Sequence, residues 1–219
     1  VYFRGNATAT GVLPNVGQIL GTVIFDLNGF TLKQTYTNSA LLNTQGKNWQ
    51  GMDDATLKFI NGNIELKTNL LSFSAYGSGY ANAPGFKTYH LYFDNVNFSY
   101  TTGSTATAFL GKYGDDASTA GKTVAYDIEF NNCTFDMTNA PANSTILNAN
   151  DTKTGEADTN CVINIVVKGG KIITANSDTV WAEWGDNNSS VAFEKNANGE
   201  LIVLVLTADA DEVKFGVES

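Results

Sequence analysis

Residues 57–66 read LKFINGNIEL, and four other segments of the chain repeat the same pattern. These segments are VIFDLNGFTL (23–32), LYFDNVNFSY (91–100), IEFNNCTFDM (128–137) and INIVVKGGKIIT (163–174). Each one alternates apolar and polar residues on both sides of a short break, which is typical of two β-strands that meet at a bend. The segments align on one apolar position, occupied in chain order by Phe25, Phe59, Phe93, Phe130 and Val167.

The aligned positions are separated by 34, 34, 37 and 37 residues. Two residues before each stands an aliphatic residue: Val23, Leu57, Leu91, Ile128 or Ile165. Five residues after each stands another apolar residue: Phe30, Ile64, Phe98, Phe135 or Ile172. Seven residues after, the series is Leu32, Leu66, Tyr100, Met137 and Thr174. Fixed offsets at this period predict stacked repeats whose inward side chains form columns. Phe193 resembles a sixth, irregular member of the series.

The break between the two strands carries asparagine in three of the five segments. Asn61, Asn95 and Asn132 hold this position, whereas Leu27 and Gly169 hold it in the first and fifth segments. Asparagine tolerates a left-handed backbone, and its amide can hydrogen-bond to an identical amide one level away. We therefore expect an asparagine ladder three levels deep at the bend.

A third apolar patch follows each pair of strands by about ten residues. The patches are Leu41-Leu42, Leu70-Leu71, Phe109-Leu110, Ile146-Leu147 and Val180-Trp181. Three strands per repeat predict an all-β fold, a three-sided right-handed parallel β-helix of about five to six turns. A β-sandwich or jelly roll is the alternative, but it predicts hairpins and no fixed-offset columns.

Two features of this sequence resemble the pectate-lyase-like superfamily of right-handed parallel β-helices. They are the DLNG…TL motif at 26–32 and the repeated F-x-N-x-x-F motif, as in Phe130–Phe135. In character the chain is most similar to the β-helical regions of bacterial surface and adhesin-like proteins. The resemblance covers roughly residues 20–206, and it implies a fold more strongly than a function, because that superfamily includes lyases, hydrolases, tailspikes and adhesins.

The residues that catalysis would require are scarce. The resemblance implies a basic catalytic residue in a lyase, but Arg4 is the only arginine and precedes the repeats. It also implies Gly-His-Gly and Arg-x-Lys segments in a hydrolase, and both are absent. The single histidine, His90, reads as a structural surface residue, and Lys58 and Glu129 read as solvated strand residues. We therefore assign no catalytic residue, while a degenerate polysaccharide-degrading enzyme, lyase or glycoside hydrolase, stays open as the alternative.

Charge and composition exclude further classes of function and partner. The formal net charge is −9, with 13 basic and 22 acidic residues among 219. No basic face can be assembled for phosphates, so we expect no nucleic-acid partner. No apolar stretch is long enough to insert into a membrane as a helix. We expect an extracellular or cell-surface location, solubility being the simple reason for the acidity.

An aromatic residue followed by glycine recurs after the third strand in three repeats. The apolar residues Phe73, Leu110 and Trp181 each stand three positions before the ring. Aromatic rings beside carboxylates suit carbohydrate, because a sugar packs its apolar face on the ring while its hydroxyls find acceptors. The predicted carbohydrate-binding residues are Tyr76, Tyr113, Trp184, Asp115, Asp116 and Asp186. The alternative is that these rings cover the ends of the core.

Metal binding and disulfide formation have little support in the sequence. Asp151, Glu156 and Asp158 lie in one loop and could bind calcium, but their irregular spacing favours a solvated loop. We expect no cofactor. The two cysteines fall out of register, so we expect a buried free thiol at Cys133 and no disulfide with Cys161.

We expect one domain over residues 1–219. Residues 1–20 form an N-terminal cap or first turn, 21–206 the repeating turns, and 207–219 a C-terminal cap or linker. The chain begins at Val1 without a signal peptide, so we expect it to be part of a longer or processed protein with flanking domains. The function expected is a non-enzymatic module of a bacterial surface or secreted protein. It would contact glycans or a host-cell partner, or serve only as a rigid spacer.

Overall fold

The computed structural model is built from β-strands. It describes residues 1–11, 13, 21–43, 54–73, 87–112, 124–141, 145–148, 161–168, 170–173, 182–183, 192–195, 201–204, 206–207 and 214–215. Within these ranges every regular element is a strand, and no helix is present that could cross a membrane. The all-β prediction is confirmed for this part of the chain.

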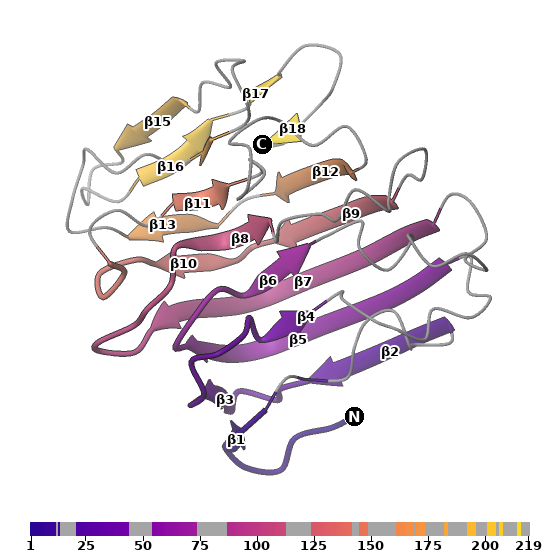
Figure 1. Ribbon diagram of the computed structural model, residues 1–219, viewed down its shortest axis with the longest axis vertical. Coiled ribbons are helices and arrows are strands. Elements are labelled where there is room, and N and C mark those ends of the chain that lie inside the picture. The colour runs from indigo at the N-terminus through magenta and orange to yellow at the C-terminus, as the bar shows by residue number, and fades with distance from the viewer. Residues whose placement is uncertain are drawn as a thin grey trace.

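The strands form a large, mainly parallel sheet, a second sheet that is parallel, and a short C-terminal pair (Figure 1). The first sheet contains β1 (Ala7–Ala9), β2 (Gly21–Asp26), β3 (Thr31–Gln34), β5 (Asp54–Leu66), β7 (Lys87–Tyr100), β9 (Val124–Asn131), β10 (Thr134–Asp136), β12 (Cys161–Lys168), β13 (Lys171–Ile173), β15 (Ala192–Lys195) and β16 (Leu201–Leu204). The second contains β4 (Leu42–Asn43), β6 (Leu71–Phe73), β8 (Ala108–Lys112), β11 (Thr145–Asn148) and β14 (Ala182–Glu183). The pair is β17 (Leu206–Thr207) and β18 (Lys214–Phe215).

The repeats lie directly beside one another in the register predicted from the sequence. Phe25 of β2 pairs with Phe59 of β5, Phe59 with Phe93 of β7, and Phe93 with Phe130 of β9, always in parallel. Val167 of β12 pairs with Phe130 and continues the series. In Figure 1 these strands rise one above another from the N-terminal to the C-terminal end.

The four phenylalanine rings form a stacked column. Their centroids are 4.9 Å apart between Phe25 and Phe59, 5.6 Å between Phe59 and Phe93, and 5.0 Å between Phe93 and Phe130. The planes of successive rings differ by at most 12°. The spacing follows the distance between neighbouring strands, about 4.8 Å, so backbone pairing and ring stacking reinforce each other.

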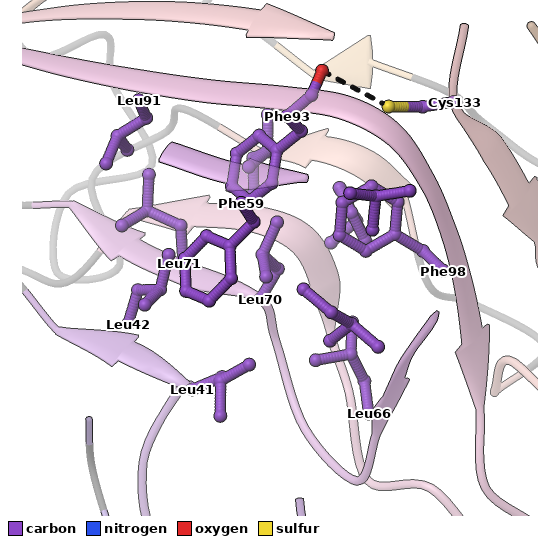
Figure 2. Packing of buried hydrophobic residues seen from close by; sticks show 14 of the residues in the cluster. Leu41, Leu42, Phe59, Leu66, Leu70, Leu71, Leu91, Phe93, Phe98 and Cys133 are labelled. Atoms are coloured by element: carbon purple, nitrogen blue, oxygen red, sulfur yellow. Dashed lines mark hydrogen bonds between the residues drawn. The ribbon is translucent and has the colours of Figure 1, made fainter. Parts of the chain in front are cut away.

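Leucines of the second sheet complete the core around this column. Leu42 of β4 pairs with Leu71 of β6, and Leu71 pairs with Leu110 of β8. Figure 2 shows Leu42 and Leu71 on the side of the core where the rings of Phe59 and Phe93 lie, and these leucines and Leu110 belong to the same buried cluster as the two rings. The two sheets therefore share a single core.

The bend inside the first sheet depends on asparagine. Asn61, Asn95 and Asn132 have left-handed backbones, with φ of 58°, 52° and 50°. The side-chain amide of Asn132 donates to Oδ1 of Asn95 at 2.7 Å, and that of Asn61 donates to Oδ1 of Asp26 at 3.5 Å. The bend was predicted at the correct residues, because few side chains other than asparagine adopt this conformation.

The bend of the first repeat differs from the expected register. Leu32 pairs with Ile64 and not with Leu66, so this bend holds two extra residues. Asn28 and Gly29 both have positive φ and form a turn in which the amide of Phe30 donates to the carbonyl of Leu27 at 2.8 Å. Leu27 is thereby fully buried over Gly62, where a Cβ would overlap the Leu27 Cβ and lie 2.7 Å from the Phe30 carbonyl oxygen.

The C-terminal strands break the parallel order. Leu201 of β16 pairs antiparallel with Ile172 of β13, and Phe193 of β15 pairs antiparallel with Val203. Phe193 is therefore part of a hairpin on the edge of the sheet, and its interpretation as a sixth parallel member is wrong. In the second sheet Ala182, and not Trp181, lies opposite Leu147.

The N-terminal residues add a level below β2 and β3. Tyr2 forms a parallel bridge with Asp26, and Ala7–Ala9 pair in parallel with β3. The amide of Leu13 donates to the carbonyl of Leu41 at 3.2 Å. These residues therefore contact the next repeat along β2 and β3 and at Leu41, directly before β4.

Candidate functional site

One outward surface of the first sheet gathers side chains that carry chemistry. Side chains alternate between the two faces of a strand. The residues one and three positions before each phenylalanine of the stacked column therefore point away from the core. On β5, β7 and β9 these positions form two rows across the strands. The first row is Thr56, His90 and Asp127, and the second is Lys58, Tyr92 and Glu129. We call these six half-buried residues the β7 face.

The first row contains a contact between an imidazole and a carboxylate on neighbouring strands. Nδ1 of His90 lies 3.3 Å from Oδ2 of Asp127, and the two side chains are 26% and 38% exposed. A carboxylate at this distance orients the imidazole ring. Both side chains remain accessible to a molecule bound on the sheet.

The second row places an aromatic ring between opposite charges. Tyr92 lies opposite Lys58 of β5 on one side and Glu129 of β9 on the other. The rings of Tyr92 and His90 lie within 3° of parallel with centroids 6.3 Å apart. A ligand on Tyr92 would therefore meet an apolar surface, an ammonium donor and a carboxylate acceptor within one strand spacing.

Cys133, the cysteine whose side chain the structure describes, is unsuited to nucleophilic or redox chemistry. Cys133 is a free thiol, fully buried beside the phenylalanine column, and its Sγ donates to the carbonyl of Phe93 at 3.4 Å (Figure 2). Burial raises the pKa of this thiol from 9.0 to about 12, so it stays protonated at neutral pH. The prediction of a buried free thiol is confirmed, and Cys133 acts as a core residue.

The six carbohydrate-binding residues predicted from sequence lie outside the described residues. These are Tyr76, Tyr113, Trp184, Asp115, Asp116 and Asp186. Leu71 lies opposite Leu110, as the apolar patches predict, but Phe73 lies opposite Lys112 and not Leu110, so Phe73 and Leu110 do not occupy the equivalent positions that the aromatic stripe assumes. The aromatic stripe stays a prediction.

The calcium candidates Asp151, Glu156 and Asp158 also lie outside the described residues. Within the described part of the chain, no group of three or more histidine, cysteine or acidic residues could hold a metal ion. The calcium prediction is therefore neither supported nor weakened.

Sequence reasoning missed the contact between His90 and Asp127, although the signal was present. His90 stands three residues before Phe93, and Asp127 stands three residues before Phe130. The alignment that predicted the core column also predicts this pair on the opposite face. His90 was interpreted alone as a surface residue because the outward position three residues before the column was not compared from level to level.

Comparisons with known proteins identify no relative of this chain. No protein-family model matches it, and neither a curated protein nor a solved structure gives a match. Function must therefore be inferred from the chemistry of the β7 face.

Proposed function

We propose that the chain is a right-handed parallel β-helix of the pectate-lyase-like type, with about five to six turns. Three features support this proposal: parallel pairing of successive repeats, a bend at left-handed asparagines, and a second parallel sheet that packs on the same core. Right-handed connections are favoured because parallel strands of one sheet are joined that way in about 98% of cases.

The function that we propose is carbohydrate contact by a non-enzymatic, extracellular module. The observation that carries it is the half-buried ring of Tyr92 on a rigid sheet, between Lys58 and Glu129. Sugars pack their apolar faces on aromatic rings and direct hydroxyls to charged and amide groups around them. Because the sheet is held from behind by the core, binding on it requires little ordering of the protein.

A glycan array, followed by titration of the strongest ligand, tests this function. We expect binding by the unchanged protein and loss of binding by Tyr92→Ala. Tyr2→Ala is the matched control, since Tyr2 is a solvent-exposed tyrosine that lies outside the β7 face. Thermal unfolding of both variants checks that the fold is kept. Equal binding by Tyr92→Ala and the unchanged protein would reject the assignment, and absence of any glycan binding would favour a rigid spacer.

A polysaccharide-degrading enzyme is the second candidate, and the carboxylates of β9 favour it. Asp127 and Glu129 are two residues apart on one face, which puts their Cα atoms about 7 Å apart. Paired carboxyl groups of glycoside hydrolases lie about 5–10 Å apart. Release of reducing ends from a polysaccharide, abolished by both Asp127→Asn and Glu129→Gln, would establish this activity over simple binding.

The remaining proposals concern the location of the protein, its partners and the binding of calcium. The net charge of −9 supports an extracellular or surface location, with glycans or cell-surface molecules and flanking domains as partners, and without nucleic acid. We propose no resident cofactor. Calcium binding by the loop with Asp151, Glu156 and Asp158 would raise the melting temperature in calcium relative to chelator.

A further inference from the structure

We infer that Asn97 carries an N-linked glycan, a sugar chain bound covalently to its side-chain nitrogen. This inference goes beyond the proposed carbohydrate contact and shares with it only the extracellular location. Asn97 follows the left-handed bend at Asn95, whereas Tyr92 and the rest of the β7 face precede that bend.

The sequence at this position is an acceptor motif. Asn97-Phe98-Ser99 is an asparagine followed two residues later by a hydroxyl-bearing residue, the pattern on which transferases for N-linked sugars act. Side chains alternate along a strand, so Asn97 and Ser99 share the outward face, while Phe98 between them is buried in the core. Asn97 is exposed and Ser99 is half-buried. The two side chains that the motif requires are therefore presented together on one rigid strand.

The neighbours of Asn97 across the sheet are small polar residues. Asn63 of β5 lies opposite it on one side and Thr134 of β10 on the other, and both are half-buried. Nδ2 of Asn97 donates a hydrogen bond to Oδ1 of Asn63 at 3.1 Å. An asparagine amide has two N–H hydrogens and glycosylation replaces one of them, so the other remains for this hydrogen bond. The fold therefore accommodates the modification without losing its contact to Asn63.

Backbone geometry does not account for an asparagine at this position. Asn95 has a φ of 52°, a left-handed conformation that asparagine tolerates better than most residues. Asn97 lies in regular strand, without a positive φ, and asparagine is depleted in strands. An acceptor role supplies a reason for this residue that the bend does not.

Two further acceptor motifs lie among the described residues, and the structure uses their asparagines differently. Asn132-Cys133-Thr134 crosses the bend, and Asn132 has a φ of 50° with its Nδ2 held by Oδ1 of Asn95 at 2.7 Å. In Asn6-Ala7-Thr8 the side chain of Asn6 supports the backbone, because its Oδ1 accepts from the amide of Thr31 at 2.9 Å. Asn97 is the acceptor whose motif is extended along one strand and whose side chain supports neither a bend nor a backbone amide.

The modification forms one bond and breaks one. Nδ2 of Asn97 attacks the anomeric carbon of a sugar activated as a glycosyl pyrophosphate, and the pyrophosphate leaves with the bonding electrons. A base of the transferase takes the proton released from Nδ2. The product is a secondary amide, bulky and hydrophilic, on the outward face of the sheet.

Mass spectrometry of the protein isolated from the surface of the cells that make it tests the inference. Trypsin cleaves after lysine and arginine and therefore releases residues 88–112, which contain both Asn95 and Asn97. Fragmentation of this peptide should place a sugar mass on Asn97 and none on Asn95. Asn95 is the matched internal control, because it is also exposed but is followed two residues later by an asparagine without a hydroxyl. An unmodified peptide, or equal modification of both asparagines, would overturn the inference.

Two substitutions at Ser99, in protein produced by the same cells, test whether the motif directs the modification. Ser99→Ala should lose the sugar from Asn97, whereas Ser99→Thr should retain it, because threonine keeps the hydroxyl. Thermal unfolding of both variants checks that the fold is kept. A sugar that persists on Asn97 in Ser99→Ala would overturn the assignment.

The outcomes separate this inference from the proposed function. A protein that binds glycans through Tyr92 but has an unmodified Asn97 would overturn this inference alone. A protein that is modified at Asn97 but binds no glycan would overturn the carbohydrate contact alone.

Discussion

Replacement of Phe93 by alanine should be among the most destabilising single changes in this chain. Phe93 is 1% exposed and lies in the middle of the column, stacked on Phe59 at 5.6 Å and on Phe130 at 5.0 Å. It also meets the edge of Phe98 at 5.3 Å. Removing a buried phenylalanine costs about 3–5 kcal/mol, and each aromatic pair contributes roughly 0.5–1.5 kcal/mol beyond its buried area. We expect a loss of about 4–5 kcal/mol in the free energy of unfolding.

Equilibrium unfolding in urea, followed by circular dichroism, measures this loss. Tyr92→Ala is the matched control, since it removes a similar ring from the same strand on the outward side, and it should cost about 1 kcal/mol or less. Phe93→Leu keeps most of the volume and should cost about 1–1.5 kcal/mol, which provides a measurable variant if alanine prevents folding. Equal losses for Phe93→Ala and Tyr92→Ala would refute the buried column.

Three further predictions concern the bend and the buried thiol. Gly62→Ala should lower the free energy of unfolding by about 1–3 kcal/mol in a urea titration, because its Cβ would overlap Leu27; an unchanged midpoint would contradict this packing. Asn95→Ala should cost about 1 kcal/mol more than Asn95→Gly, because only alanine is strained at φ 52°; equal thermal midpoints would contradict the left-handed bend. The thiol of Cys133 has a pKa of about 12 in the fold against 9.0 unfolded. The unfolded state therefore loses this proton first, so the contribution of Cys133 to stability is complete below pH 9 and is lost as the pH rises toward 12. Cys133→Val should make the alkaline decline shallower in unfolding titrations above pH 9, where buried tyrosines such as Tyr36 account for the rest, and an identical decline in the variant would argue against burial of the thiol.

The parallel register of the middle repeats could be predicted from sequence because apolar side chains recur there at fixed offsets. Phe59, Phe93 and Phe130 pair as aligned, and the asparagine at each bend has the left-handed backbone that its chemistry favours. In the first repeat the fixed offsets gave the wrong register for the strand after the bend. Its bend buries Leu27 over a glycine, so a loop with two extra residues preserves the core while breaking the offset.

The C-terminal end was mispredicted for a related reason. Phe193 lies in the short run VAF before Glu194, and Val203 lies in the wholly apolar run Leu201–Leu204, but an apolar pattern contains no information on strand direction. Antiparallel pairing satisfies the backbone groups of the edge at β13 equally well. The direction depends on the connection between the strands, which the apolar pattern does not encode.

The candidate site was predictable in part. The alignment that predicts the inward residues of the core also predicts which outward residues lie side by side, so the two rows of the β7 face follow from it. The contact of His90 with Asp127 needed side-chain geometry in addition, since register alone places the two residues on neighbouring strands without a distance.

The stacking of successive repeats can be tested most directly by nuclear Overhauser contacts in the isotopically labelled protein. We expect ring-to-ring contacts between Phe25 and Phe59, between Phe59 and Phe93, and between Phe93 and Phe130, with none between Phe25 and Phe130. Strong contacts between α-protons of β5 and β7, which mark antiparallel strands, or rings that share no contacts, would contradict the account.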